Sequence, residues 1–528
     1  MKTEDLKNKK FPAGSFEFAQ MDATIHDKKF DTKPVGSFQS AMRRFAKNKS
    51  SIVAGVIIVL LILFAIIGVE VSHYEVDFVD KDYTNYLPKV HGLEWIGWDG
   101  SRKVTITEAE YWSYVAMAKE TGHNPIIEVY DHYDIETVYG KLKQKKHFYD
   151  VKIDTYATAG NMFKTVTDEE YAAIQKYQDE HNIQIIYPAF PVASKDQAAS
   201  LDQYNANMWY EILDTKGVKK GIPVGVKEDR SDVDFVAKYI AFRGYDEATG
   251  LPRDGYTSKM TIEEGERQYE YGIRKQNSWY IRVNAYDYFT YKYGNEPEFW
   301  FGTNQYGQDV FTRLAAGARF SLLLAVCVAT INFVVGAIIG CLEGYYGGVF
   351  DITMQRIVEI LSRLPSYAVF TLFNLHLAHK IGAIPSLMFA FIVTGWIGPS
   401  ETLRMQFYRF KNQEYVLAAR TLGARDGRLM FKHILPNAIG TVITSSVLAI
   451  PGVIGAESTL SYLNIVNLNS DKITSVGTLL SGGQAVMQSY PHIILFPALF
   501  LSLLMICFNL FGNGLRDAFN PQLRGTEG

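Results

Sequence analysis

IVAGVIIVLLILFAIIGV, residues 52–69, is the stretch that decides the class of this protein. It contains no charged residue, and a helix that crosses the roughly 30 Å hydrocarbon core of a bilayer needs about 20 apolar residues. About 50 mostly polar residues precede it and no convincing small-residue cleavage site follows it, which argues against a cleavable signal peptide. The stretch therefore predicts a first membrane-spanning helix.

Five further apolar runs of spanning length follow in the second half of the chain. They cover residues 320–342, 354–378, 384–399, 438–462 and 492–512. The run 354–378 contains Pro365, which a membrane helix tolerates if neighbouring helices satisfy the carbonyl that the proline frees. Residues 75–297 are polar and rich in Tyr, so the 528-residue chain averages only 48% hydrophobic residues. We expect an α-helical polytopic membrane protein with six membrane-spanning helices and an inserted α+β domain.

The distribution of basic residues orients these helices. Four basic residues crowd the start of the first helix, and only Lys81 follows it closely. Because cytoplasmic flanks carry an excess of Lys and Arg, residues 1–51 are expected in the cytoplasm. Alternation then places residues 70–319 outside the cytoplasm, and the loop 403–437 and the tail 513–528 inside it. The loop carries seven Lys and Arg residues against two acidic ones, which supports this orientation independently.

The cytoplasmic loop contains EYVLAARTLGARDGRLMFKHILPN, residues 414–437. Residues 414–422 favour a helix, and Gly423 stands where a left-handed C-terminal cap would end it. Asp426 can cap a second short helix, which we expect to end before Pro436. The small side chains at 418 and 419 let the surface of a partner approach the backbone. From physical chemistry alone, a solvated basic loop without a partner is an equal alternative.

This loop resembles the EAA loop of the permeases of binding-protein-dependent ABC importers. The matching residues are Ala418, Ala419, Gly423, Leu435 and Pro436, with His433 at the first Ile position. Leu417 stands at the usual Glu position, so the polar contact of that Glu is not available here. In the family this element is the coupling helix, which sits in a groove of an ATPase subunit. The resemblance implies ATPase coupling for Glu414, Tyr415, Leu417, Ala418, Ala419, Arg420, Gly423, Leu435 and Pro436.

Other stretches resemble the C-type (OppC/DppC-like) permease of oligopeptide and dipeptide importers. FGTNQYGQDVFTRLAAGARFSL, residues 301–322, is similar to the segment before the second membrane helix of that subclass. Asn304 and Gln308 replace its usual Asp and Arg, so a salt link between these positions is absent. SFQSAMRRFAKNKSSIVAG at 37–55 and FNLFGNGLRDAFNPQLR at 508–524 are similar as well. We treat residues 301–319 as a pre-span segment and residues 320–512 as a five-helix permease core.

The resemblance implies a type I ABC importer permease in a bacterial cell membrane, forming half of a channel for oligopeptides or dipeptides. The implied partners are a second, B-type permease, two ABC ATPase subunits that bind ATP and Mg, and an extracytoplasmic binding lipoprotein. It implies no catalytic residue, no metal, no cofactor of its own and no nucleic acid. Two alternatives stay open. One is the same type of ABC importer with nickel chelates or glutathione as cargo, and the other is a membrane-anchored receptor or enzyme that acts through the outer domain.

The string LSGGQ, residues 480–484, occurs in the ATP-hydrolysing subunits of ABC transporters. In the expected topology it lies outside the cytoplasm, where ATP is absent. No G-x-x-x-x-G-K-S/T phosphate loop occurs in the chain. We therefore interpret the string as coincidental and expect ATP hydrolysis in partner subunits.

The insertion 75–297 shows the pattern of an α+β domain. Thr107 with Glu110, and Thr167 with Glu170, each fit a capping box that starts a helix. Strands are expected at 125–130, 183–190, 147–159 and 278–291, and the first two follow the two helices as a weakly repeated helix-strand unit. DHYD at 131–134 and His123, His147 and His181 are interpreted as surface residues rather than metal ligands. The many Tyr residues suit either a recognition surface or a core.

Polar residues within the apolar runs are costly and call for a partner or an aqueous path. Glu359 and Arg363 are four residues apart and can pair on one helix face. Asn332 and Glu457 can line the transport pathway or bond neighbouring helices, and both interpretations stay open. The three cysteines, Cys327, Cys341 and Cys507, all lie in apolar runs, which excludes a disulfide framework in the outer domain.

Overall fold

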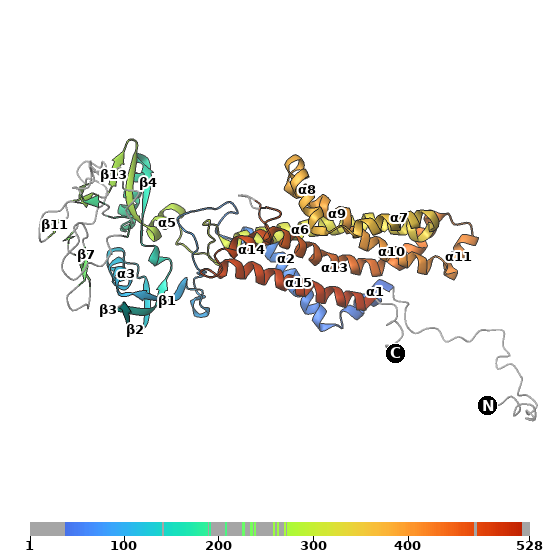
Figure 1. Cartoon of the computed structure of the whole chain (residues 1–528), viewed down its shortest axis with the longest axis horizontal. Coiled ribbons are helices and arrows are strands. Elements are labelled where there is room, and N and C mark those ends of the chain that lie inside the picture. The colour runs from blue at the N-terminus through green and yellow to red at the C-terminus, as the bar shows by residue number, and fades with distance from the viewer. Residues whose placement is uncertain are drawn as a thin grey trace, which may run out of the picture.

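The structure is a computed structural model with a bundle of long helices at one end and an α/β domain at the other (Figure 1). It describes residues 37–139, 142–187, 190–191, 206–207, 224–226, 233–235, 237–238, 257–258, 261–262, 269–270, 272–468 and 473–519. The expected tail 513–528 is therefore described only to residue 519, and most of the segment 1–51 lies outside the described residues.

The first membrane helix forms where the sequence predicts it. Helix α2 spans Lys49–Val71, and the Asn48 side chain caps its start by accepting a hydrogen bond from Ser51 N at 3.4 Å. The short helix α1, Ser37–Phe45, precedes it. The exposed large hydrophobic residues of α2 are all Val, Ile and Leu, so this helix suits a lipid environment. Its Gly68 backbone meets Ala315 of the next long helix closely enough that a Cβ would lie 2.9 Å away.

Helix α6 is longer than its apolar run and spans Val310–Tyr346. It begins at the N-cap Asp309, so the second half of the expected pre-span segment is helical. The predicted helix 354–378 is wrong as one element, because the chain forms α7 at Gly348–Ser362 and α8 at Ser366–Ile381. Between them Pro365 has an extended backbone with ψ of 119° and cannot donate the hydrogen bond that would continue the helix.

The remaining helices complete the bundle. They are α9 Ala383–Gly395, α10 Ile397–Phe410, α11 Glu414–Thr421, α12 Asp426–Arg428, the π-helix η5 Leu429–Ile434, α13 Leu435–Tyr462, α14 Val476–Gln484 and α15 His492–Phe519. The predicted short helix, α12, ends at Arg428 and η5 ends at Ile434, both before Pro436. That proline lies in the first turn of α13, where its missing N–H costs nothing.

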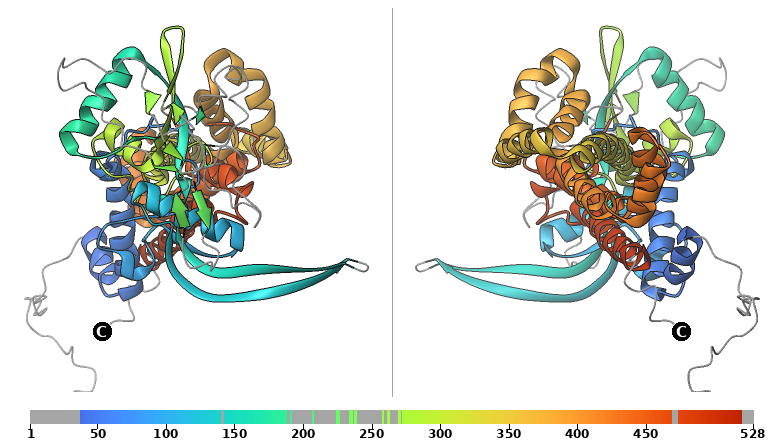
Figure 2. Two further views of the ribbon diagram at one scale, coloured as in Figure 1. Left: turned by 90° about the vertical axis from the view of Figure 1, so that its left-hand side faces the viewer. Right: turned by 90° about the vertical axis from the view of Figure 1, so that its right-hand side faces the viewer.

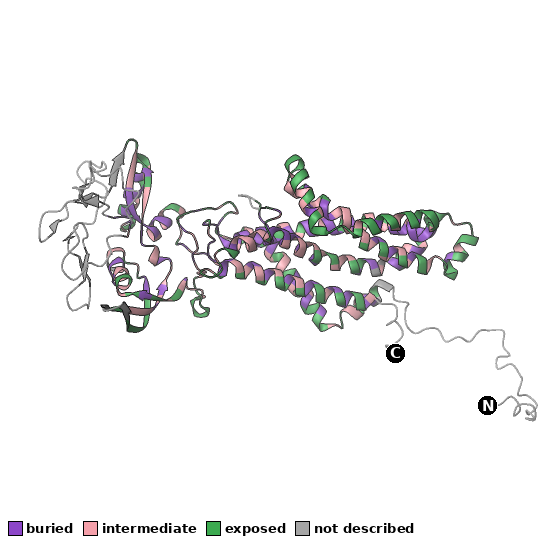
Figure 3. Ribbon diagram, in the orientation of Figure 1, coloured by how far each residue is buried: buried purple, intermediate pink, exposed green. Residues whose placement is uncertain are grey.

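Within the described residues, five helices are long and apolar enough to cross a membrane. They are Lys49–Val71, Val310–Tyr346, Ala383–Phe410 with its joint at Trp396, Val442–Tyr462 and His492–Phe519. The sixth predicted crossing corresponds to α7 and α8, which the break at Pro365 divides. The chain is a helical multi-pass membrane protein, and exposed residues cover much of the bundle's outer surface in Figure 3.

The α/β domain contains two units with the order strand, helix, strand. The first consists of β1 Ser101–Thr107, α3 Glu108–Thr121, β2 Ile126–Tyr139 and β3 Leu142–Asp154, with antiparallel order β1-β3-β2. The second consists of β4 Asn161–Thr167, α4 Asp168–His181, β5 Ile186–Tyr187, β13 Gly272–Lys275 and β14 Ser278–Asn284, with order β13-β14-β4 and β5 beside β14. Short strands accompany them: β6 Phe190–Pro191, β7 Val224–Val226, β8 Val233–Phe235, β9 Ala237–Lys238, β10 Thr257–Ser258, β11 Thr261–Ile262 and β12 Tyr269–Glu270.

In this domain, the predictions from helix-capping residues agree with the structure better than the predictions from alternating strand patterns. The Thr107 capping box is complete, and the Thr167 hydroxyl accepts from Glu170 N at 3.1 Å. The predicted strand 278–291 is wrong beyond Asn284, because the Asn284 side chain caps helix α5, Ala285–Tyr293, by accepting from the N–H groups of Tyr286 and Asp287.

Many of the tyrosines form a core where the domain meets the helices. Tyr74, Tyr83, Tyr86 and Tyr156 are buried around Phe289 and Phe299, and Tyr86 stacks on Tyr156 with ring centroids 4.6 Å apart. Burial raises the pKa of the Tyr83 phenol far above its ordinary value. Its hydroxyl donates to Ala285 O at 2.8 Å, which satisfies the only strong donor of the side chain. These four tyrosines therefore form part of a core and not of a recognition surface.

Candidate functional site

The loop between α10 and α13 packs against the bundle through one apolar face. Val416 of α11 and Leu429 and Ile434 of η5 are fully buried against Leu403 and Phe407 of α10. Val442 of α13 and Cys341 and Tyr345 of α6 complete the cluster. A displacement of α11 would therefore move the adjoining ends of α6, α10 and α13 together, since a close-packed cluster transmits strain.

The opposite face of α11 is exposed and small or apolar. Leu417, Ala418 and Leu422 face outward, and Leu422 is 88% exposed. Ala419 is half-buried on the inner side, so the two adjacent alanines differ in accessibility. Leu417, which occupies the Glu position of the related motif, is 43% exposed and enlarges this apolar face. Glu414 and Tyr415 are exposed at the start of the helix.

Tyr345 of α6 ties the two arms of the loop together. Its hydroxyl donates to Asp426 Oδ1 at 2.5 Å and accepts from Arg420 Nη2 at 3.4 Å. The predicted N-cap role of Asp426 is wrong, because Arg425 is the N-cap of α12 and the Asp426 carboxylate bonds Tyr345 instead. Sequence reasoning missed this link because Tyr345 lies 75 residues before Arg420.

Gly423 adopts the left-handed conformation predicted for it, with φ of +83°. A Cβ added there would have nothing within 4 Å, so the backbone conformation and not crowding favours glycine. Leu435 and Pro436 form the first turn of α13 and fix where the chain re-enters the bundle.

Asn332 lies in a membrane-embedded cleft rather than at a lipid-facing position. It is 6% exposed and its Nδ2 donates to Phe391 O at 3.4 Å, while its Oδ1 has no hydrogen-bond partner among the described residues. The cleft has a volume of about 440 Å³ and lies between α6, α9, α10 and α13. Every residue that lines it is uncharged: Ala329, Asn332, Phe391, Thr394, Gly395, Gly398, Pro399, Thr402, Ser445, Ser446, Ala449, Gly452 and Val453.

Glu457 bonds neighbouring helices and does not line that cleft. Its carboxylate is buried and accepts hydrogen bonds from Ser321 of α6 at 3.0 Å and from Ser461 of its own helix at 2.9 Å. The open choice for Glu457 is therefore decided in favour of helix-helix hydrogen bonding.

The predicted pair between Glu359 and Arg363 does not form. Glu359 accepts from Arg356 Nη1 at 2.6 Å, three residues before it, and Arg363 is the C-cap of α7 next to the break. A pair that sequence reasoning missed joins Arg404 of α10 to Asp351 of α7, with Nε 2.5 Å from Oδ1. The only sign of this ion pair in the local sequence is the basic charge of Arg404. The same charge is equally typical of a cytoplasmic loop, so it does not predict the pair.

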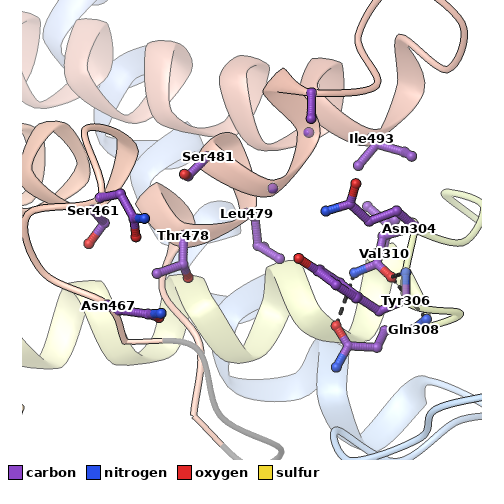
Figure 4. Close-up of a pocket in the computed structure, with 15 residues that line it drawn as sticks. Asn304, Tyr306, Gln308, Val310, Ser461, Asn467, Thr478, Leu479, Ser481 and Ile493 are labelled. Carbon is purple, nitrogen blue, oxygen red and sulfur yellow. Dashed lines mark hydrogen bonds between the residues drawn. The ribbon is translucent and has the colours of Figure 1, made fainter.

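A second pocket opens at the other end of the bundle, beneath the α/β domain. It has a volume of about 230 Å³, and Figure 4 shows side chains of the 304–310 turn, α14 and the end of α13 converging on it. Asn304 and Gln308 stay paired without charge, since Asn304 Nδ2 donates to Gln308 Oε1 at 3.0 Å. The LSGGQ string lies here in α14, at the opposite end of the bundle from α11 (Figure 1).

Two of the three singled-out histidines of the α/β domain pair with separate carboxylates, whereas His181 Nδ1 lies 3.0 Å from the Tyr177 carbonyl oxygen. His123 Nε2 lies 2.9 Å from Asp287 Oδ1, and His147 pairs with Asp134. Within the described residues no group of three His, Cys, Asp or Glu side chains is arranged to hold a metal ion.

Comparisons with known proteins identify the family. Residues 332–525 match the model of the "Binding-protein-dependent transport system inner membrane component", and residues 36–88 match the "N-terminal TM domain of oligopeptide transport permease C". These ranges leave residues 89–331, which contain the α/β domain, between them.

Three relatives show how much of the chain the family covers. The oligopeptide transport system permease protein OppC of Bacillus subtilis is 39% identical over 46% of this chain and 79% of its own length. The dipeptide transport system permease protein DppC of Bacillus subtilis is 41% identical over 43% and 69%, and OppC of Haemophilus influenzae is 40% identical over 42% and 70%.

Among solved structures, a chain of the MetNI methionine ABC transporter in an inward facing conformation matches with a TM-score of 0.33. The identity is 14%, over 39% of this chain and 96% of that one, a likeness too weak to define the fold. The sequence matches suffice, because the relatives align over more than two thirds of their own length at 39–41% identity. The chain belongs to the OppC/DppC family of transport permeases, the inner membrane components of binding-protein-dependent transport systems.

Proposed function

We propose that this chain is the C-type permease subunit of an ATP-driven importer of oligopeptides or dipeptides. The relatives' names supply the cargo class, and no observation on this chain favours nickel chelates, glutathione or an enzymatic role. The partners would be a second permease, two ATPase subunits that bind ATP and Mg, and a binding lipoprotein. The observation that carries the proposal is the exposed apolar face of α11, seated on a buried cluster that joins three membrane helices.

The proposed topology has six crossings in a type I importer fold, with α7 and α8 together forming the broken third crossing. Figure 1 supports it, since α11 and the α/β domain lie at opposite ends of the helix bundle. With the basic loop in the cytoplasm, both termini are cytoplasmic and residues 70–319, including the inserted domain, are extracytoplasmic.

The proposed coupling is mechanical. ATP binding would draw the two ATPases together, and the groove that holds α11 would move with them. Because Val416, Leu429 and Ile434 pack on α6, α10 and α13, the motion reaches the helices that line the cleft at Asn332. That cleft has no charged lining residue, which suits cargo whose side chains vary while its main-chain amides stay the same.

The test is disulfide crosslinking from α11 in the assembled transporter. Ala418→Cys, in a background without Cys327, Cys341 and Cys507, should crosslink to a cysteine placed in the ATPase groove. Ala419→Cys is the matched control, since it is one residue away on the same helix but turned towards the bundle. Equal crosslinking at both positions, or none at 418 in a transporter that hydrolyses ATP, would contradict the coupling role.

The cargo is tested separately by uptake of labelled di- and oligopeptides into vesicles that contain the purified transporter. The labelled peptides should accumulate in the vesicles, and unlabelled peptides should lower that uptake by competition. Transport of a nickel chelate or glutathione without peptide uptake would contradict the proposed cargo class. The assignment of the chain as a permease would still hold.

A further inference from the structure

Residues 90–98 form a closed loop between the helix bundle and the α/β domain. A bridge between Lys89 and Asp99 joins the two ends of the loop. At its tip the 3-10 helix η1, Glu94–Ile96, makes one turn, which Gly97 ends with a left-handed φ of +87°. The loop therefore has a defined shape, and the side chains at its tip project from a fixed turn.

The tip of this loop presents two adjacent apolar side chains. Trp95 is 81% exposed and Ile96 is 46% exposed. Among the described residues no other large aromatic side chain is exposed to that extent. A tryptophan that packs against a surface buries 150–250 Å² in general, so an indole left in water forgoes a large hydrophobic stabilisation. The tip therefore calls for an apolar cover.

The base of the loop is fixed to the end of a membrane helix. The Trp98 ring lies 6.0 Å from the Phe301 ring and 6.1 Å from the Phe496 ring, measured between centroids. Phe301 in turn stacks on Phe496 at 4.1 Å. Phe496 is the fifth residue of α15, which begins at the end of the bundle from which the α/β domain extends (Figure 1). Trp98 therefore lies at the level where α15 begins.

A series of ring contacts connects this level to the membrane-spanning part. Phe301 contacts Phe311 of α6 with centroids 5.1 Å apart, and Phe311 contacts Phe64 of α2 at 5.4 Å. Phe64 belongs to the uncharged run 52–69, which must lie in the hydrocarbon core. Three successive ring contacts thus lead from the hydrocarbon core to Trp98.

The surface of α15 that suits lipid begins at the same level. Its exposed aliphatic residues start one residue before Phe496 and recur along one stripe of the helix: Leu495, Leu499, Leu503, Ile506 and Leu510. Trp95 lies at most roughly 10 Å from Trp98, because only three residues separate them along the chain. The interfacial layer on each side of the hydrocarbon core is about 5 to 8 Å thick. The loop tip is therefore within reach of that layer.

The charge beside Trp95 favours a lipid interface over a protein surface as the cover. Glu94 is exposed, and its carboxylate accepts a hydrogen bond from Gly92 N at 2.9 Å. A protein that covered the tip would remove water from this carboxylate, which is costly unless a new partner pairs with it. The headgroup layer stays hydrated, and Trp is enriched there because its apolar ring and its N–H suit both sides of the boundary.

We infer that Trp95 and Ile96 insert into the lipid interface at the end of the bundle that carries the α/β domain, and that this anchor holds the base of the domain on the membrane. The loop is joined firmly to the domain, since Lys152 of β3 donates to Asp99 at 2.5 Å and Thr155 donates to Gly100 O at 2.6 Å. The partner of this surface is the boundary between headgroups and acyl chains of a phospholipid bilayer. The inference depends neither on the cargo nor on the other subunits.

The experiment places a single cysteine at the tip by Ile96→Cys, in a chain without Cys327, Cys341 and Cys507. The full chain is studied in phosphatidylcholine vesicles, both alone and within the complete transporter. A polarity-sensitive fluorophore on this cysteine should be quenched by lipids that carry a nitroxide near the headgroup, and it should be protected from aqueous iodide. Ile135→Cys is the matched control, because it is 44% exposed on β2 of the same domain, which Figure 1 places apart from the bundle.

The outcomes separate the possible covers of the tip. Quenching by the nitroxide lipid at Ile96 and not at Ile135, in the chain alone as well as in the complex, supports the anchor. Equal access of iodide to both positions overturns it, since the tip is then in water. Protection of Ile96 only when another subunit or a binding lipoprotein is present also overturns it, since a protein is then the cover.

A second pair of variants tests the indole itself. Trp95→Ser should increase the access of iodide to the label at Ile96, whereas Trp95→Tyr, which keeps an aromatic ring with a polar tip, should retain the protection. The midpoint of thermal unfolding should stay the same in both variants, because the Trp95 side chain is 81% exposed. Unchanged protection of the label in Trp95→Ser overturns the role of the indole as the anchor.

Discussion

The α/β domain and the loop between α10 and α13 of this permease place their strongest interactions in opposite ways. The α/β domain buries the ion pair Arg282–Glu120, whose side chains are 0% and 3% exposed. The loop keeps its charges at the surface and leaves Leu417 and Leu422 exposed. An element that satisfies its own groups can hold its shape alone, whereas an exposed apolar face is completed only by a partner. The difference indicates that a buried pair of its own stabilises the α/β domain, whereas the loop presents an apolar face for contact.

The largest expected effect breaks the buried pair of the outer domain. Arg282 Nη1 and Nη2 donate to the two Glu120 oxygens at 3.2 and 3.1 Å, joining β14 to α3. Glu120→Ala leaves a buried guanidinium without its counterion and should destabilise the domain by about 3 to 5 kcal/mol. Thermal unfolding of the purified chain, together with protease sensitivity of the outer domain, measures this.

The double variant Glu120→Leu with Arg282→Met is the control for that prediction. It removes both charges and should lose much less stability than the single change. If the single variant unfolds no more easily than the double, the buried pair does not distinguish the outer domain from the loop.

The next effect is a pH dependence at Asp309, the N-cap of α6. Burial raises the pKa of Asp309 to about 6, although Thr312 N and Oγ1 both donate to its Oδ2. The folded state therefore binds more protons than the unfolded state between about pH 4 and pH 6, and stability should fall as pH rises through this window. The shift corresponds to at most about 3 kcal/mol.

Asp309→Asn tests this assignment. The amide keeps an acceptor for the N-cap of α6 but cannot ionise, so the melting temperature should lose that part of its pH dependence. An unchanged slope between pH 4 and 6 would assign the dependence to another group.

A smaller energetic change with a large functional consequence concerns the loop. Gly423→Val forces a β-branched residue into the left-handed region at a cost of roughly 1 to 2 kcal/mol, which should distort the end of α11. We expect loss of peptide uptake with normal membrane insertion. Gly427→Val is the control, because it has equal free space without a positive φ. Undiminished uptake in Gly423→Val would show that the loop shape is not needed.

The smallest effect on stability distinguishes contact from folding. Leu422→Ala removes a side chain that is 88% exposed and should change the stability of the chain by less than about 0.5 kcal/mol. It should nevertheless weaken binding of the ATPase in a titration of the purified permease. Val349→Ala, 82% exposed on α7, is the control for the loss of an exposed aliphatic group. Equal ATPase binding by both variants would contradict a docking role for the apolar face of α11.

Predictions from local sequence signals were largely confirmed. The first membrane helix, the helix at 414–421, the positive φ of Gly423 and the capping box at Thr107 each depend on residues within one or two turns. Such signals act through backbone hydrogen bonds and local conformational preference, which the chain carries wherever it folds.

Predictions that required a choice between partners were less successful. Glu359 bonds Arg356 instead of Arg363, and Asp426 bonds Tyr345 of a distant helix instead of capping α12. Helix propensity around Pro365 could not reveal whether neighbouring helices would satisfy the freed carbonyl, and the chain breaks there. Each of these outcomes depends on which groups packing brings within hydrogen-bond distance.

The amino-acid sequence by itself determined five of the six predicted membrane helices, the basic loop and the family, because apolar length, charge asymmetry and short motifs are properties of contiguous residues. Only the tertiary structure decided that Glu457 joins α13 to α6, that Arg282 meets Glu120, and that β2 and β3 continue past β1 as a two-stranded ribbon across the long axis of the molecule (Figure 2). These features arise from contacts between segments more than a hundred residues apart or, for the part of the chain that the structure describes, from the absence of a neighbouring strand. The physical reason is that packing in three dimensions decides burial and pairing.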